Sequence, residues 1–126
     1  MITVEQAEQV HHVLIRKFGG LTGIRDKPGP EAALARPYAT FDGQELYAEP
    51  VDKAAAIFES LVINHPFMDG NKRISYVLMR LTLLDSGFDI AATQNEKYEM
   101  VIAASKGEIR FDEIRQWLAD RLLKTS

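Results

Sequence analysis

The chain has 126 residues, of which 46% are hydrophobic and 26% are charged. This length suffices for one hydrophobic core and is short for two ordinary domains, so we expect a single domain over residues 1–126. The formal net charge of −3 and a sequence pI near 5.6 argue against a surface that binds nucleic acid.

Cysteine is absent, which excludes a disulfide framework and thiolate chemistry. The first residues lack the charged and apolar blocks of a signal peptide. The apolar runs also stop well short of the roughly 18 residues that a membrane-spanning helix needs. We therefore expect a cytoplasmic protein with neither a membrane nor a nucleic acid as its partner.

The first predicted helix begins after Thr3, which forms a capping-box pattern with Gln6, and it ends at Gly19-Gly20. Its inward face is indicated by residues at helical spacing, namely Val4, Ala7, Val10, His11, Leu14 and Phe18. Residues 20–30 are rich in glycine and proline and predict a loop.

A short helix and a hairpin are predicted next. Pro30 suits the first turn of the helix, which Pro37 ends or kinks. The Asp42-Gly43 pair then predicts a small hairpin or an exposed flap. Residues of strand character flank this pair, namely Thr40, Phe41, Leu46 and Tyr47.

Two strong helices follow the hairpin. The first begins near Pro50 and places His65 at its end, and the second ends by Gly87. The apolar stripe of the first consists of Val51, Ala54, Ala55, Phe58, Leu61 and Val62. The wider stripe of the second, which predicts a central and largely buried helix, consists of Ile74, Tyr76, Val77, Leu78, Met79, Leu81, Leu83 and Leu84.

Two more helices complete the pattern. One runs from Glu96 to Ser105 and stops at Gly107, and Asp112 is expected to cap the last. The face of the last helix consists of Ile114, Trp117, Leu118, Arg121 and Leu122. Together the elements predict an all-α fold, a compact bundle of about six helices with a possible short hairpin flap.

The nine residues HPFMDGNKR join the two central helices and hold the densest chemistry in the chain. Histidine titrates near neutral pH, so His65 suits a general base, and Asp69 offers the hard oxygen ligand that Mg²⁺ prefers. Backbone N–H groups at the start of the following helix favour anions, namely those of Gly70, Asn71 and Lys72. The loop predicts a site for phosphoryl or nucleotidyl transfer.

Several of these residues also have structural interpretations. Phe67 is expected to anchor the loop in the core, and Asp69 is expected both to cap the next helix and to bind metal. Asn71 either closes the turn or holds a phosphate oxygen. Arg73 either balances the acidic surface or makes a bidentate phosphate contact. On the first helix, the side chains interpreted as packing or capping groups are His11 and His12.

The pattern HxFxDGNxR resembles the signature of the Fic/Doc (Fido) superfamily, and Lys72 makes it similar to the death-on-curing (Doc) toxin branch. Other segments resemble Doc-type chains in order and spacing, namely FGGLTGIRD, EAALARPYATFDGQELY and GEIRFDEI. The resemblance covers nearly the whole sequence and implies a compact Fido-type helical bundle.

The resemblance also implies a chemistry. In the wider Fic group the motif is HPFxDGNGR, whose second Gly leaves room for inner phosphates, and AMP is transferred. Lys72 fills that room, so the resemblance implies an inverted ATP whose γ-phosphate meets a protein hydroxyl. The implied enzyme is a Fic-fold Ser/Thr protein kinase without GxGxxG, HRD or DFG motifs. Its site would consist of His65 as base, Asp69 on Mg²⁺, and Gly70, Asn71, Lys72 and Arg73 on phosphates.

As partners, the resemblance implies a bacterial or phage-encoded toxin–antitoxin system. The target would belong to the translation machinery, with elongation factor Tu as the known kind, and a Phd-like antitoxin would neutralise the toxin. No self-inhibitory [S/T]xxxE[G/N] run is found, so control comes from a separate chain or is absent. The target is expected to dock in extended form on the flap, which consists of Phe41, Asp42, Gly43, Leu46 and Tyr47.

Three other interpretations stay open. One is a Fic-type protein adenylyltransferase, which Gly70 permits because it is the general Fic residue, although Tyr76 stands where AMP-transferring relatives often have Arg. Another is a non-catalytic ATP- or antitoxin-binding module, against which intact His65 and Asp69 argue. The third is a plain helical bundle whose loop binds anions.

Overall fold

A computed structural model describes residues 1–26 and 28–125. Its elements, in chain order, are α1 (Val4–Phe18), α2 (Pro28–Ala35), the 3-10 helix η1 (Arg36–Tyr38), β1 (Thr40–Phe41), β2 (Gln44–Glu45), α3 (Pro50–Asn64), α4 (Asn71–Asp85), β3 (Phe88–Ile90), α5 (Gln94–Ser105), α6 (Phe111–Asp120) and β4 (Leu122–Lys124). The predicted helical fold is confirmed. Within the described residues, no helix combines the length and apolar character needed to cross a membrane.

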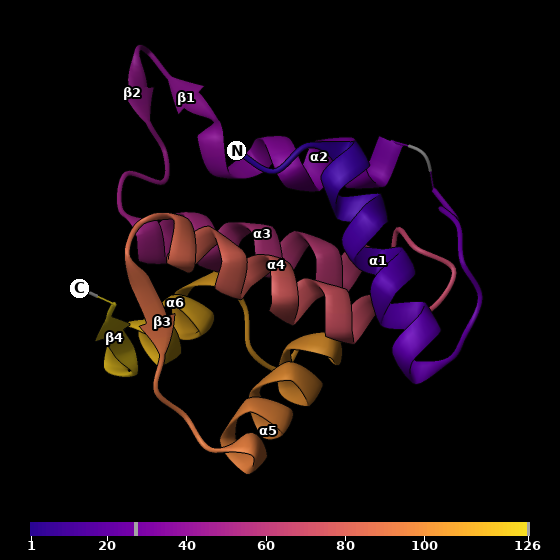
Figure 1. The fold of residues 1–126 in the computed structure, drawn as a ribbon. Coiled ribbons are helices and arrows are strands. Elements are labelled where there is room, and N and C mark those ends of the chain that lie inside the picture. Colours follow the sequence, from indigo (N-terminus) through magenta and orange to yellow (C-terminus); the bar gives the residue numbers. More distant parts are fainter. Residues whose placement is uncertain (27, 126) are drawn as a thin grey trace.

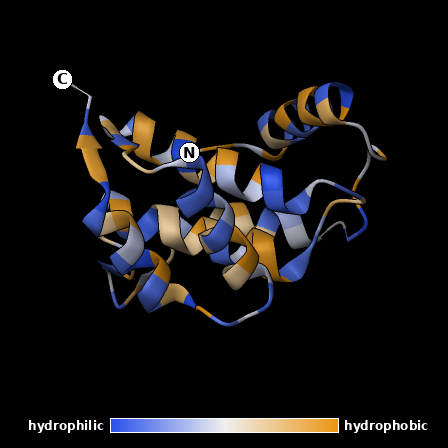
Figure 2. Ribbon diagram, turned by 90° about the horizontal axis from the view of Figure 1, so that it is seen from below, coloured by the Kyte–Doolittle hydropathy of each residue, from blue (hydrophilic) through white to orange (hydrophobic). Residues whose placement is uncertain are grey.

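Helices α3 and α4 form the centre of the fold and run in opposite directions (Figure 1). Their length and apolar stripes agree with the prediction, and Phe58, Leu78 and Leu83 are fully buried. One part of the core lies toward α1 and α2, and the other lies toward α5 and α6. Hydrophobic and hydrophilic residues alternate around the outer helices (Figure 2), as expected for helices that bury one face.

Helix α1 begins with the predicted capping box, in which the side chain of Thr3 accepts a hydrogen bond from the Gln6 N–H. The helix ends at Gly19, whose φ of 88° is accessible to glycine at little cost. Its inward face buries Ala7, His11 and Ile15. This face packs toward α4, so α1 contributes to the surroundings of the loop that joins α3 to α4.

The predicted hairpin is present as the antiparallel pair β1–β2. Its turn residues Asp42 and Gly43 both have positive φ, 54° and 80°, which is the backbone of the turn that Asp-Gly favours. The base of the hairpin is fixed by Lys53, whose Nζ donates to the Tyr47 carbonyl oxygen and to Glu45. The hairpin projects from the body of the protein at the start of α3 (Figure 1).

Several boundaries differ from the prediction. Helix α2 begins at Pro28, and α5 begins at Gln94 after its cap Thr93. Helix α6 begins at Phe111 with Asp112 inside its first turn, so the expected Asp112 cap is wrong. Helix α6 also ends at Asp120, and the residues after it form β4, which pairs antiparallel with β3 in a sheet that the sequence did not predict.

Candidate active site

The loop HPFMDGNKR turns the chain from α3 into α4 through two left-handed residues. His65 ends α3 with φ 48°, and Gly70 precedes the first residue of α4 with φ 72°. A Cβ atom on Gly70 would also lie 3.3 Å from Cδ1 of Ile15, so both the backbone and the space favour glycine. His65 is partly buried, whereas Asp69, Lys72 and Arg73 are exposed.

Asn71 closes this loop with both ends of its side-chain amide. Its Oδ1 accepts from the Phe67 N–H at 3.0 Å, and its Nδ2 donates to the Phe67 carbonyl oxygen, also at 3.0 Å. Of the two roles expected for Asn71, the structure contains the turn-closing one. The second hydrogen of Nδ2 has capacity for a further acceptor.

Phe67 anchors the loop in the core, where its side chain is only 1% exposed. Its ring stacks on the imidazole of His11, with ring centroids 4.3 Å apart. The same imidazole, itself 3% exposed, places Nε2 2.7 Å from the carbonyl oxygen of Asp69. His11 therefore packs as expected and also holds the motif loop, a role that sequence reasoning missed.

The expected cap role of Asp69 is wrong. The residue before α4 is Gly70, and no side chain caps this helix start. Oδ2 of Asp69 instead accepts from the Leu21 N–H at 2.8 Å. The left-handed turn at Gly70 separates the Asp69 carboxylate from the start of α4. Because Oδ2 makes the bond to Leu21, Oδ1 stays available to a ligand.

Residues 20–26, predicted only as a loop, run alongside the motif. Ile24 forms an antiparallel bridge with Phe67, the Met68 N–H donates to the Gly23 carbonyl at 3.0 Å, and the Arg25 N–H donates to the Pro66 carbonyl at 2.8 Å. We call residues 20–26 the motif-paired segment. The FGGLTGIRD segment therefore includes residues that pair with the motif loop, a contact that the sequence alone does not predict.

The β1–β2 hairpin does not lie at the site. It leads into the first residue of α3, whereas His65 follows the last, and a helix of 15 residues is about 22 Å long. None of the flap residues contributes to the groove around His65. The expectation that Phe41 to Tyr47 forms the target-docking flap is therefore wrong in position, because α3 carries the chain away from the hairpin before the motif begins.

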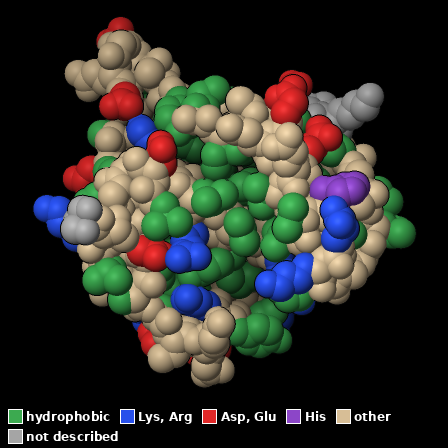
Figure 3. Space-filling view, viewed as in Figure 1, with side chains coloured by type: hydrophobic (Ala, Val, Ile, Leu, Met, Phe, Trp, Pro, Cys, Tyr) green, Lys and Arg blue, Asp and Glu red, His purple; other side chains and the backbone are tan. Residues whose placement is uncertain are grey.

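A groove of about 950 Å³ opens beside the motif loop. One face of α4 and one face of α5 form its walls, and the end of α1 borders it. Lys and Arg side chains lie among hydrophobic ones over α4 and α5 (Figure 3). The lining residues from the motif are His65, Met68, Asp69, Gly70, Asn71, Lys72 and Arg73.

Arg73 and Tyr76 illustrate how the groove wall is ordered. The Arg73 guanidinium lies 4.2 Å from the centroid of the Phe18 ring, a cation–π contact that fixes it at the mouth of the groove. The Tyr76 hydroxyl is buried without a hydrogen-bond partner in the described part of the chain, and burial raises the pKa of Tyr76 to about 12. Further along α4, Arg80 makes a bidentate ion pair with Asp89, at 2.8 and 2.9 Å.

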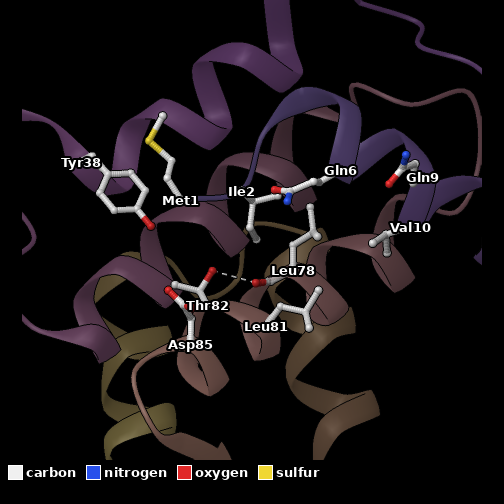
Figure 4. A pocket seen from close by; sticks show the side chains of 10 residues that line it. All are labelled: Met1, Ile2, Gln6, Gln9, Val10, Tyr38, Leu78, Leu81, Thr82 and Asp85. Atoms are coloured by element: carbon white, nitrogen blue, oxygen red, sulfur yellow. Dashed lines mark hydrogen bonds between the residues drawn. The ribbon is translucent and has the colours of Figure 1, made fainter.

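A second pocket, of about 410 Å³, lies between the start of the chain and α4 (Figure 4). Its lining mixes apolar and polar side chains, and Asp85 is the one charged side chain among the residues that form it. Thr82 uses its hydroxyl within α4, donating to the Leu78 carbonyl at 2.8 Å. This pocket contains no motif residue, so the larger groove is the candidate active site.

The motif side of the groove thus combines a histidine, an exposed carboxylate, the cations Lys72 and Arg73 and a helix N-terminus, a combination suited to phosphate chemistry. The model of the Fic/DOC family matches residues 1–83, more than half of the chain, including the whole motif loop. The chain belongs to the Fic/DOC family.

The individual relatives are of two kinds by name, a toxin and protein adenylyltransferases. Toxin Doc of Mycolicibacterium smegmatis is 43% identical over 75 residues, which cover 60% of this chain and 58% of that protein. Protein adenylyltransferase fic-1 of Caenorhabditis elegans is 34% identical over 73 residues, or 55% of this chain and 14% of that protein. Protein adenylyltransferase Fic of Drosophila willistoni is 35% identical over 89 residues, or 66% and 18%. The chain therefore spans less than two thirds of the length of each of these relatives.

Proposed function

We propose that this chain is a Doc-type toxin that transfers the γ-phosphoryl group of ATP to a Ser or Thr hydroxyl of a protein. The observation that carries the proposal is the position of Lys72. Its exposed side chain lines the same groove as His65 and forms no ion pair within residues 1–26 and 28–125. An ammonium here occupies the room that inner phosphates need for AMP transfer.

The proposed reaction is a direct displacement at phosphorus. His65 accepts the proton of the acceptor hydroxyl, and the acceptor oxygen forms a bond to Pγ. The bond between Pγ and the β–γ bridging oxygen breaks, and ADP leaves with that oxygen. Lys72, Arg73 and the first N–H groups of α4 stabilise the phosphate charge.

Asp69 fits the Mg²⁺ that such a reaction uses. Within the described residues, no group of three His, Asp or Glu side chains is arranged to hold an ion alone. Mg²⁺ is commonly held by one or two carboxylates together with substrate phosphates, and the exposed Asp69 carboxylate suits that arrangement. When bound with ATP, the ion would neutralise phosphate charge.

The acceptor chain is proposed to dock on the motif-paired segment. The bonds made by Gly23 and Arg25 flank Ile24, so the N–H and C=O of Ile24 itself face the edge away from the loop. An extended peptide pairing with that edge would lie beside His65. Two exposed apolar side chains, Leu21 (62% exposed) and Met68 (45%), provide contacts for it.

We propose elongation factor Tu as the acceptor protein and a Phd-like antitoxin as the neutralising partner. The 43% identity to Toxin Doc of M. smegmatis supports a toxin with an antitoxin. The pocket of Figure 4, whose lining mixes apolar and polar side chains, is the proposed binding site for an antitoxin segment, and it includes the exposed side chains of Met1 and Leu81. A segment bound there would contact α4 from the side opposite the groove.

Protein adenylylation is the second candidate, because the nematode and insect relatives are named protein adenylyltransferases. The test uses ATP labelled on the γ-phosphate in one reaction and on the α-phosphate in another, with purified chain, Mg²⁺ and bacterial lysate. We expect only the γ label on a protein near the size of elongation factor Tu. Transfer of the α label supports adenylylation instead, and transfer of neither label overturns the enzymatic proposal.

A further inference from the structure

Helix α5 forms a whole wall of the groove, although it lies beyond residues 1–83 and contains none of the motif. Its lining residues recur at helical spacing and therefore share one face, namely Gln94, Lys97, Tyr98, Val101 and Ile102. They face the α4 residues Lys72, Arg73, Tyr76, Val77 and Arg80 across the groove. The chemistry of this wall indicates what the groove binds beyond the motif loop.

Besides Arg80, which is paired with Asp89, Lys97 joins Lys72 and Arg73 as a cation of the groove. Its Nζ lies 5.7 Å from the centroid of the Tyr76 ring, and Tyr76 shares a face of α4 with Lys72 one turn earlier. In the described part of the chain, none of the three cations Lys72, Arg73 and Lys97 forms an ion pair. Three such cations around one groove complement a ligand with several negative charges.

Tyr98 adds an open aromatic face. Its side chain is 66% exposed, and within residues 1–26 and 28–125 neither an aromatic ring nor a cation stacks on it. The other exposed aromatic lining residue, Phe18, already has the Arg73 guanidinium 4.2 Å from its ring centroid. Tyr98 is therefore the available platform for a flat heteroaromatic ring, which stacks favourably on tyrosine.

We propose that α5 binds the nucleoside end of a nucleoside triphosphate, with the base on Tyr98 and the phosphates between Lys97 and the cations of the motif loop. The proposal rests on the proposed function in taking a nucleoside triphosphate as the donor. Lys97 on α5 contacts the ring of Tyr76, which lies one turn after Lys72 on α4, and Tyr98 follows Lys97 on α5. A base held there directs the terminal phosphate, rather than the α-phosphate, toward His65.

The test is isothermal titration of the full chain with Mg²⁺-ATP and, separately, with Mg²⁺-tripolyphosphate, which lacks the nucleoside. We expect Tyr98→Ala to weaken ATP binding by about tenfold and to leave tripolyphosphate binding unchanged. We expect Lys97→Ala to weaken both ligands by a similar factor, about fivefold to tenfold. Lys106→Ala, at the exposed residue that follows α5 and lies outside the groove, is the matched control and should change neither.

Phe18→Ala distinguishes the two aromatic residues, and thermal melts verify that every variant is folded. Unchanged ATP affinity in Tyr98→Ala, or loss of ATP selectivity in Phe18→Ala instead, would overturn the assignment of α5. If the wild-type chain transfers phosphate and Tyr98→Ala does so equally well, the proposed function stands and this inference is wrong. If ATP binding depends on Tyr98 but no protein is modified, this inference stands and the proposed function is wrong. If the wild-type chain binds neither ATP nor tripolyphosphate, both are wrong.

Discussion

Nε2 of His11 lies 2.7 Å from the backbone carbonyl oxygen of Asp69, although 58 residues separate them. Because a carbonyl oxygen only accepts, the imidazole must carry its proton on Nε2. The same ring stacks on Phe67, so α1 supports the motif loop by a polar and an apolar contact at once. The buried face of α1 is thus part of the scaffold that positions the candidate metal ligand.

The first prediction concerns this contact. His11→Phe keeps an aromatic ring for stacking and removes the donor, which leaves the Asp69 carbonyl oxygen without that partner. We expect the free energy of unfolding to fall by about 1–3 kcal/mol and transfer activity to fall as well. Urea unfolding and a transfer assay measure the two effects. His12→Phe, on the exposed side of α1, is the control, and equal behaviour of the two variants would contradict the scaffold role.

The second prediction concerns the proposed base. His65→Ala should abolish transfer, because no other histidine among the described residues lines the groove. The fold should survive, since His65 is only partly buried, although a left-handed backbone at this position is slightly strained for alanine. His65→Asn tolerates that backbone better and should be equally inactive. A folded variant with near wild-type transfer would exclude His65 as the base.

The third prediction concerns the type of transfer. Lys72→Gly removes an ammonium and restores the space of the HPFxDGNGR loop, so γ-phosphoryl transfer should fall and AMP transfer should rise. Lys72→Ala is the matched variant that removes the charge but keeps Cβ. Mass spectrometry of the acceptor distinguishes the two products. Undiminished phosphorylation in both variants would show that Lys72 does not determine the chemistry, and full conversion is not expected while Tyr76 stands one turn later.

The fourth prediction concerns stability at low pH. Burial alone would raise the pKa of Glu59, but hydrogen bonds from Arg36, Arg110 and the Phe111 N–H lower it below its ordinary value. The folded state therefore favours the charged carboxylate. The resulting stability is fully present above the unfolded pKa of roughly 4.3 and is lost as the pH falls through the lower folded pKa.

Urea unfolding between about pH 6 and pH 3 measures this contribution. The wild-type chain should lose more stability over this range than Glu59→Gln, which carries no titrating group at that position. Glu8→Gln, at an exposed position of α1, should follow the wild type. Parallel curves for Glu59→Gln and the wild type would contradict the linkage.

Local signals predicted the elements well where they act over a few residues. The Thr3–Gln6 capping box and the Asp42-Gly43 turn both lie where the sequence indicated, because each depends on hydrogen bonds or backbone angles within four residues. The β3–β4 pair escaped prediction because its three-residue strands lie more than 30 positions apart. Strands that short have no recognisable periodicity of their own.

The sequence predicted which motif residues form the candidate site, but not the contacts that hold the motif loop in place. The motif residues from His65 to Arg73 do line one groove, which follows from their adjacency in the chain. The links to His11 and Leu21 are non-local, so spacing gives no sign of them. The predicted position of the hairpin was wrong for a related reason, because the distance between the hairpin and His65 depends on the direction of α3.

The most direct test of γ-phosphoryl transfer is the mass of elongation factor Tu after incubation with the chain, Mg²⁺ and ATP. We expect one Ser or Thr to gain a single phosphoryl group and ADP to form in equal amount. His65→Ala should give unmodified elongation factor under the same conditions. An AMP adduct on the factor would contradict γ-phosphoryl transfer, and an unmodified factor with the wild-type chain would contradict the proposed acceptor.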